Sequence, residues 1–313
     1  MTRFQIKTLQ QLVKHSLPAI AIGIGAWLPL QLPSYAGEIL ERVAQTGVLR
    51  VGAQTDAIPF GFQDESGQWQ GYSVDILNLL GERLEAKLGR PVQLEFTGSN
   101  PQNRFDLVSQ NLVDIECGTA TFTWEREGRV DFTLSYFPNG TQLLVEQGDA
   151  DWSIPALVGR KIGIVANTTN EAAMRGLQPR ADFVYVRDRF EGFEALQAGD
   201  IDGLASDGIT LEGLRYTTET PEAWDVVPDL PYVLESFACI VPHDESEWRD
   251  FVNVTLAGFM QGVVNNEPAM ISIYERWFGD DGLVPYPQDL VSNYFFSIVN
   301  TLEWLPRAGN WAE

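Results

Sequence analysis

Short apolar runs of strand length alternate with amphipathic helical patterns along most of this chain of 313 residues. One series of apolar runs covers residues 48–52, 92–96 and 113–117, and a second covers 161–165, 183–186 and 201–205. Helical patterns cover about 75–88, 104–110, 190–198 and a long last stretch, 248–278. This alternation predicts the α/β class. Because the polar segment 146–151 separates the two series, the sequence predicts two α/β lobes.

The N-terminal segment has the pattern of an export signal. Three basic residues precede an uncharged, mostly apolar run from 17 to 32: Arg3, Lys7 and Lys14. The run is followed by Ser34-Tyr35-Ala36, a small-x-small ending that predicts cleavage after Ala36. The alternative is a retained membrane anchor, but Pro18 and Pro29 interrupt the run and Pro33 follows it, and its apolar part is shorter than the roughly 20 residues that a span needs.

Charge and composition limit the partners of the chain. Its 43 acidic residues against 21 basic ones give a formal net charge of −22, which disfavours nucleic acid and anionic membrane surfaces as partners. Two histidines and two cysteines leave little for metal sites or histidine-based catalysis. We therefore expect no metal and no cofactor. In an oxidising compartment Cys117 and Cys239 either pair or remain two buried thiols.

Three groups of segments, in order, resemble the family 3 extracellular solute-binding proteins, the periplasmic receptors of amino-acid ABC transporters. The first group is 47–52, 59–62 and 71–75; the second is 102–104, 114–121, 125–126 and 130–133; the third is 167–171, 194–203 and Asp207. Within the family, Gln102-Asn103-Arg104 and Glu116-Cys117-Gly118 are most similar to the glutamate/aspartate-binding branch. The order and spacing of the segments together are specific, although no single segment is.

The resemblance implies a type II periplasmic binding protein-like fold with two lobes joined by a two-strand hinge. Residues 37–141 and 237–313 would form lobe 1, and 142–236 an inserted lobe 2. Both cysteines would then lie in lobe 1 near the hinge, which favours a disulfide. The implied function is to bind a free polar or acidic amino acid, glutamate or aspartate and possibly glutamine, and to deliver it to a membrane permease. We expect a periplasmic monomer that is not an enzyme.

A free amino acid carries a carboxylate and an ammonium group, so its site must supply a cation and an anion. The resemblance assigns the carboxylate to Arg126, Thr121 and Thr169, and the ammonium group to Asp207 and Thr119. Thr168 and Thr169 are expected to begin a helix, whose free amide groups suit an anion. Outside the resemblance, each residue has a structural reading: the arginines as surface residues, Asp207 as a helix cap, and the threonines as strand residues.

The side-chain end of the ligand is assigned, by the same resemblance, to Arg104, Gln54 and Arg189. An arginine at position 104 predicts an acidic ligand side chain, because a buried guanidinium without an anion is costly. The chain departs from the branch at Gln54, where a basic residue is usual, at Pro101, where a small hydroxyl is usual, and at Arg189, where a histidine is usual. The choice among glutamate, aspartate and glutamine therefore stays open.

Two other functions remain as alternatives. Cyclohexadienyl dehydratases resemble these receptors, and such an enzyme needs a general acid in the cleft, for which Glu116 and Glu125 are candidates. The chain also suits a noncovalent amino-acid sensor, since no span or signalling domain is apparent after the predicted lobes.

Overall fold

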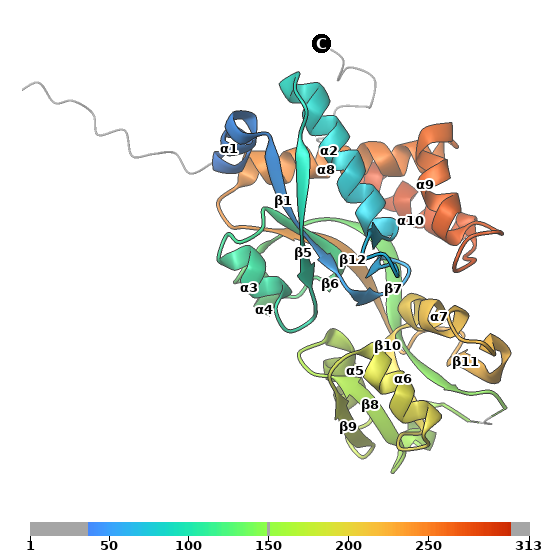
Figure 1. The fold of residues 1–313 in the computed structure, drawn as a ribbon. Coiled ribbons are helices and arrows are strands. Elements are labelled where there is room, and N and C mark those ends of the chain that lie inside the picture. Colours follow the sequence, from blue (N-terminus) through green and yellow to red (C-terminus); the bar gives the residue numbers. More distant parts are fainter. Residues whose placement is uncertain (1–36, 149–150, 302–313) are drawn as a thin grey trace, which may run out of the picture. The chain divides into compact units, whose positions relative to one another are not determined.

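The computed structural model describes residues 37–148 and 151–301 (Figure 1). The predicted export signal and its cleavage after Ala36 lie outside these residues. Within the described part of the chain, no helix is both long enough and apolar enough to cross a membrane.

Nine strands of the described residues form one mixed sheet. Their order across the sheet is β5 (Gln93–Ser99), β1 (Val48–Gln54), β6 (Ile115–Thr121), β12 (Val233–Val241), β7 (Asp131–Glu146), β10 (Gly203–Asp207), β8 (Lys161–Val165) and β9 (Asp182–Val186), and β11 (Trp224–Val227) pairs with β7. The strands β5, β1 and β6 are parallel to one another, as are β10, β8 and β9. A small second sheet contains β2 (Asp56–Ala57), β3 (Gly61–Gln63) and β4 (Trp69–Gln70). The predicted α/β class is confirmed.

Strands β7 and β12 join the two parallel groups. They pair antiparallel from Val233 opposite Thr141 to Val241 opposite Asp131. β12 also pairs with β6, and β7 also pairs with β10. The lobe boundaries expected at 141 and 236 both fall inside this two-stranded ribbon.

The helices divide between the two groups of strands (Figure 1). With β1, β5 and β6 lie α1 (Glu38–Thr46), α2 (Tyr72–Leu88), α3 (Arg104–Ser109), α4 (Trp124–Glu127), α8 (Ser246–Val264), α9 (Pro268–Phe278) and α10 (Gln288–Thr301). With β8, β9 and β10 lie α5 (Thr169–Leu177), α6 (Arg189–Gln197), α7 (Gly208–Tyr216) and two short 3₁₀ turns, Ile154–Leu157 and Pro221–Ala223.

Buried apolar side chains follow the same division. The largest cluster lies under α2, α8, α9 and α10, and at its centre Phe60 makes edge-to-face contacts with Tyr72, Phe137 and Phe237. Along β7 the side chains alternate between faces: Leu143 joins one cluster beside β8 and α5, and Leu144 joins another beside α6 and α7. Each parallel group thus has apolar cores of its own.

Two predicted elements differ from the structure. The helix expected from 248 to 278 is wrong as a single helix, because α8 ends at Val264 and α9 begins at Pro268. Asn266 between them has φ 55°, a left-handed conformation that ends a helix, and Pro268 suits only a first turn. The strand expected to end at Cys117 continues to Thr121.

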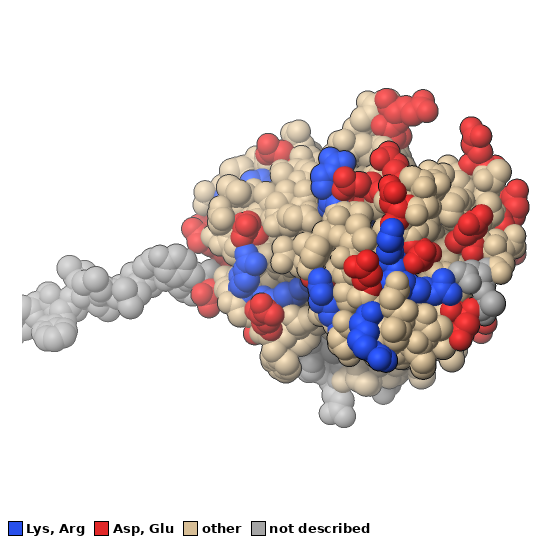
Figure 2. Space-filling model, turned by 90° about the horizontal axis from the view of Figure 1, so that it is seen from below, with Lys and Arg blue, Asp and Glu red and all other residues tan. Residues whose placement is uncertain are grey.

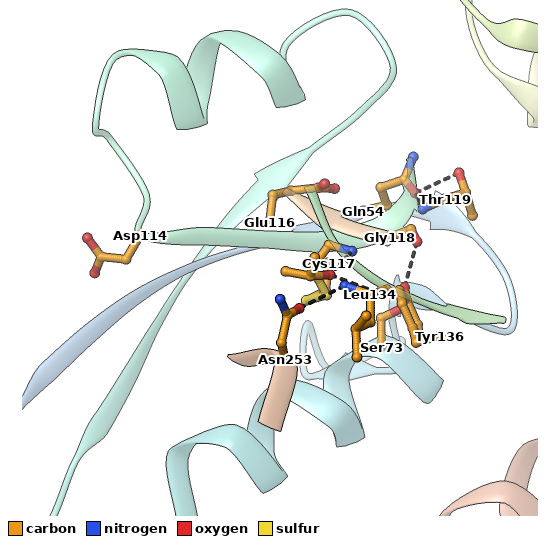
Figure 3. Close-up of a disulfide and its surroundings, with 12 residues drawn as sticks. Gln54, Ser73, Asp114, Glu116, Cys117, Gly118, Thr119, Leu134, Tyr136 and Asn253 are labelled. Carbon is orange, nitrogen blue, oxygen red and sulfur yellow. Dashed lines mark hydrogen bonds between the residues drawn. A yellow bond between two sulfur atoms is a disulfide. The ribbon is translucent and has the colours of Figure 1, made fainter. Parts of the chain in front are cut away.

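A disulfide joins Cys117 in β6 to Cys239 in β12 (Figure 3). It closes a separation of 122 residues and connects two strands that already pair. The expected disulfide is therefore confirmed.

On the face shown in Figure 2, Lys and Arg side chains are interspersed with Asp and Glu.

Candidate functional site

Six of the eight residues expected to bind the ligand lie at strand ends and helix starts, where backbone groups are free to meet a ligand. Gln54 and Thr121 end β1 and β6, Thr119 lies two residues earlier on β6, and Arg104 begins α3; Arg126 lies in α4; Thr169 and Arg189 begin α5 and α6; and Asp207 ends β10. The expected helix start at Thr168 is confirmed, since its side chain accepts a hydrogen bond from the backbone N–H of Glu171.

Gln54 lies flat against β6. Its Oε1 accepts hydrogen bonds from the backbone N–H of Thr119 at 2.5 Å and from the Thr119 hydroxyl at 2.8 Å (Figure 3). A Cβ on Gly118 would lie 2.4 Å from the same Oε1, so only glycine leaves room for this contact. Because a backbone N–H can only donate, the oxygen of Gln54 faces Thr119 and its Nε2 faces the other way.

Asp207 and Arg189 form a buried network. Asp207 Oδ1 accepts hydrogen bonds from the amide groups of Asn139 and Asn170, and its Oδ2 lies 3.0 Å from Arg189 Nη2. Arg189 Nη1 lies 3.1 Å from Asp56 Oδ2. Burial opposes the guanidinium charge, but the two carboxylates more than offset it and raise the pKa of Arg189. Arg189 therefore stays charged between Asp56 and Asp207.

Arg126 spans two groups of elements. Its Nη1 donates to the carbonyl oxygen of Thr121 at 2.8 Å, and its Nη2 donates to the carbonyl oxygen of Asn167 at 3.1 Å. The guanidinium lies over the ring of Phe105, with 5.1 Å between its central carbon and the ring centroid. Burial and then the nearby Arg104 lower the pKa of Arg126 to about 10, which leaves it a cation at neutral pH.

Glu235 on β12 faces the hydroxyls of Thr121 and Thr169. Its Oε2 accepts hydrogen bonds from Thr169 at 3.0 Å and from Thr121 at 3.4 Å. Burial, and then the negative charge of Asp207, raise the pKa of Glu235 to about 7, against the opposing effects of the Thr169 hydrogen bond and Arg126. A carboxyl group that changes its charge near neutral pH thus lies beside two expected carboxylate ligands.

Arg104 is 2% exposed, and its Nε and Nη1 have no hydrogen-bond partner. Burial lowers the pKa of Arg104, and the largest opposing influence is the negative charge of Glu116. Glu116 is itself fully buried and accepts a hydrogen bond from the Ser99 hydroxyl, while burial raises its pKa. Arg104 thus has a resident carboxyl group nearby and unused donors.

The structure brings all eight expected residues into one connected region. Hydrogen bonds and ion pairs link Gln54 to Thr119, Thr119 to Arg189 and Arg189 to Asp207. Glu235 links Thr121 to Thr169. Electrostatic influence connects Arg126 and Arg104 to Asp207.

Sequence reasoning missed four further polar residues of this region: Asp56, Asn139, Asn170 and Glu235. Asp56 lies two residues after Gln54, and that proximity was the one available signal. Asn139 and Glu235 lie opposite each other on β7 and β12, a pairing that no motif marks. Asp56 lines a pocket of about 700 Å³, together with Asn100, Gln102 and residues 185–188, 190 and 191. Within the described residues, no group of three or more His, Cys, Asp or Glu side chains could hold a metal ion.

The fold and this charged, buried region define a class of binding proteins. The model of the bacterial extracellular solute-binding proteins, family 3, matches residues 49–280. The chain belongs to that family, and its fold is that of the type II periplasmic amino-acid-binding proteins.

Individual proteins are similar over most of their length. The chain is 27% identical over 267 residues to a glutamate/aspartate import solute-binding protein of Salmonella typhimurium, covering 84% of this chain and 85% of the relative. It is 25% identical to an ABC transporter glutamine-binding protein of Bacillus subtilis, covering 74% and 81%. Among solved structures, an ancestral amino acid-binding protein, a precursor of cyclohexadienyl dehydratase, has a TM-score of 0.65 at 25% identity, covering 76% and 98%.

Proposed function

We propose that this protein is the substrate-binding component of an ABC transporter that imports an amino acid. It binds a free polar or acidic amino acid, and the candidates are glutamate, aspartate and glutamine, which the names of the relatives include. It works in the periplasm after cleavage of its export signal, as a monomer that delivers the ligand to a membrane permease.

The observation that carries this proposal is the pairing of opposite charges in one buried region. Arg126, with Thr121 and Thr169, supplies donors for an α-carboxylate, and Asp207 supplies an acceptor for an α-ammonium group. Thr169 begins α5, whose free N–H groups favour an anion. A zwitterion bound in this region would have a partner of opposite charge for each of its two charged groups, so neither group would be buried unpaired.

The division into lobes is part of the proposal. Residues 37–141 and 237–313 form lobe 1, and residues 142–236 form lobe 2. Arg126, Thr121, Thr119, Arg104 and Gln54 then belong to lobe 1, while the other three ligand residues belong to lobe 2. A ligand that contacts both lobes stabilises their closed arrangement, and the β7–β12 ribbon is the hinge.

A thermal-shift screen of the purified protein against the twenty amino acids tests the proposal. A ligand at 100 times its Kd stabilises the folded state by about 2.7 kcal/mol, which raises the melting temperature. Arg126→Ala should abolish the shift. Arg276→Ala is the matched control, because Arg276 in α9 is exposed and pairs with Asp75, away from the proposed ligand residues. The proposal fails if no amino acid shifts the melting temperature of the wild type, or if Arg126→Ala and Arg276→Ala respond alike.

One observation favours a second candidate function. Glu235, with a pKa of about 7, has the proton affinity of a general acid at neutral pH, and a solved neighbour is a precursor of cyclohexadienyl dehydratase. The two candidates for the general acid that the sequence offered have other surroundings: Glu125 is exposed, and the buried Glu116 accepts a hydrogen bond from the Ser99 hydroxyl. Incubation with prephenate, followed by phenylpyruvate absorbance, separates the functions: turnover by the wild type that Glu235→Gln abolishes would establish the enzyme.

A further inference from the structure

Polar atoms without partners are concentrated at the proposed side-chain end of the site. Among the described residues, six buried side-chain nitrogen or oxygen atoms have no hydrogen-bond partner, and five of them belong to Gln54, Asp56, Arg104 and Glu116. Buried polar groups are normally satisfied, because each unpaired group costs about 1–3 kcal/mol. These unpaired atoms therefore mark a place where a ligand completes the structure.

The five unpaired atoms include donors and acceptors. Gln54 Nε2 and Arg104 Nε and Nη1 can only donate, whereas Asp56 Oδ1 and Glu116 Oε2 can accept. The orientation of Gln54 is fixed by its contact with the backbone N–H of Thr119. The side-chain end of the site thus offers hydrogen bonds of both kinds.

Arg189 and Asp56 are connected to Gln54 by direct contacts. Arg189 Nη2 lies 3.4 Å from the Thr119 hydroxyl that Gln54 also contacts. Arg189 Nε donates to Ser206 at 2.8 Å, and its two terminal nitrogens pair with Asp56 and Asp207. Every nitrogen of this guanidinium already has a partner, so Arg189 is not free to bind a second ligand anion.

The charges of the region also argue against an acidic ligand side chain. Three arginines, at 104, 126 and 189, face four carboxyl groups, at 56, 116, 207 and 235. Arg104 is partly compensated by Glu116, and Asp56 would repel a carboxylate placed against its unpaired oxygen. Burial still outweighs Glu116 and lowers the pKa of Arg104, so its unpaired N–H groups need an acceptor, which an amide oxygen supplies as well as a carboxylate does.

We infer that the ligand side chain is a carboxamide, that of glutamine or asparagine, and that Asp56 is the residue that selects it. The amide oxygen accepts from Arg104 and Gln54, while the amide N–H donates to Asp56 Oδ1. A carboxylate offers no donor to Asp56, and an aliphatic side chain leaves both kinds of polar atom unpaired. This inference rests on the proposed function, and it departs from the ligands named for the glutamate/aspartate relative.

Titration calorimetry of the wild type with glutamine, asparagine, glutamate and aspartate at neutral pH is the first test. A site that pairs all its buried polar groups with one ligand rejects a near-isosteric one that leaves a group unpaired. We expect the better amide to bind at least about tenfold more tightly than its matching acid. If no amino acid binds, the proposed function fails. If an acid binds as tightly as its amide, only the carboxamide inference fails.

Asp56→Asn tests the role of the selecting residue. It keeps one oxygen, which Arg189 Nη1 holds, and replaces the unpaired Oδ1 with an NH2 group that can only donate. It also removes one of the two carboxylate charges beside Arg189, so the amide preference should fall at least tenfold and glutamate binding should tighten. Glu65→Gln, at an exposed position in the turn between β3 and β4, removes the same charge and should leave the preference unchanged. An unchanged preference in Asp56→Asn, or an equal change in both variants, overturns the role of Asp56. Circular dichroism shows whether each variant is folded. The ratio of amide to acid affinity in the wild type tests the carboxamide inference even if Asp56→Asn does not fold.

Discussion

Replacing Glu235 by glutamine should change the pH dependence of folding in the absence of any ligand. The pKa of this carboxyl group rises from 4.5 to about 7 on folding, first because of burial and then because of Asp207. The folded state therefore holds the proton more tightly than the unfolded chain. The stability that this proton supplies is fully present below about pH 4.5 and is lost as the pH rises through 7.

The size of the loss follows from the shift of the pKa. A difference of about 2.5 units at about 1.4 kcal/mol per unit gives roughly 3 kcal/mol. Glutamine keeps the shape of the side chain and cannot ionise, so Glu235→Gln escapes this loss. The variant should match the wild type within about 1 kcal/mol near pH 4, and it should exceed the wild type by roughly 3 kcal/mol near pH 8.

Urea unfolding of both proteins without ligand, at several pH values, measures this difference. Other titrating groups are common to both proteins, and their contributions cancel in the comparison. Glu65→Gln, an exposed carboxylate, should follow the wild-type curve at every pH. A difference between Glu235→Gln and the wild type that stays constant from pH 4 to pH 8 would refute the reasoning, because it would mean that the carboxyl group titrates alike in both states.

Four further outcomes follow from the same contacts. An ionised Glu235 would repel the ligand α-carboxylate, so Kd should rise by up to about tenfold per pH unit above 7 in the wild type and stay flat in Glu235→Gln. Arg126→Lys should weaken ligand binding at least about tenfold in calorimetry, since an ammonium group lacks the fork that reaches Thr121 and Asn167. Converting both Cys117 and Cys239 to alanine should lower the unfolding free energy by up to about 5 kcal/mol in urea, from the 122-residue separation that the disulfide closes. Asp114→Asn should lower the unfolding free energy by about 3 kcal/mol in the same assay, because its fully buried carboxylate pairs with two arginines. The Kd of the folded variant for the ligand should not change.

The fold was largely readable from local pattern. The run 161–165 became β8, whose residues 162–165 are all buried, because a strand covered on both faces needs a short continuous apolar run. The run 183–186 became its parallel neighbour β9, which lies at the edge of the sheet and is only partly buried. The break between α8 and α9 was missed, because the helical spacing of apolar residues continues across it. Asn266 and Pro268 are the local signals that end the first helix and begin the second.

The site was predictable only in part, for a physical reason. Arg126 and Asp207 stand in segments whose order and spacing resemble the family, so their candidacy could be read from the chain. Asp56 and Glu235 act through partners far away in sequence: Asp56 pairs with Arg189, and Glu235 accepts from Thr121 and Thr169. A single sequence carries no record of such pairings. The ion pairs of Arg189 and the unpaired oxygen of Asp56 favour an amide ligand over the acidic one that Arg104 alone predicts.

The disulfide limits where the ribbon of β7 and β12 can bend. Cys239 anchors β12 to β6 close to the register shift between Ala238 and Ile240. In the proposed hinge, the part of β12 that the disulfide leaves free to bend is the segment before this anchor, which runs from Val233 and includes Glu235. Glu235, whose pKa is about 7, lies in this short stretch of β12. Bending of the strand would therefore change the surroundings and the pKa of Glu235, and ionisation of Glu235 would in turn favour one curvature of the strand over another.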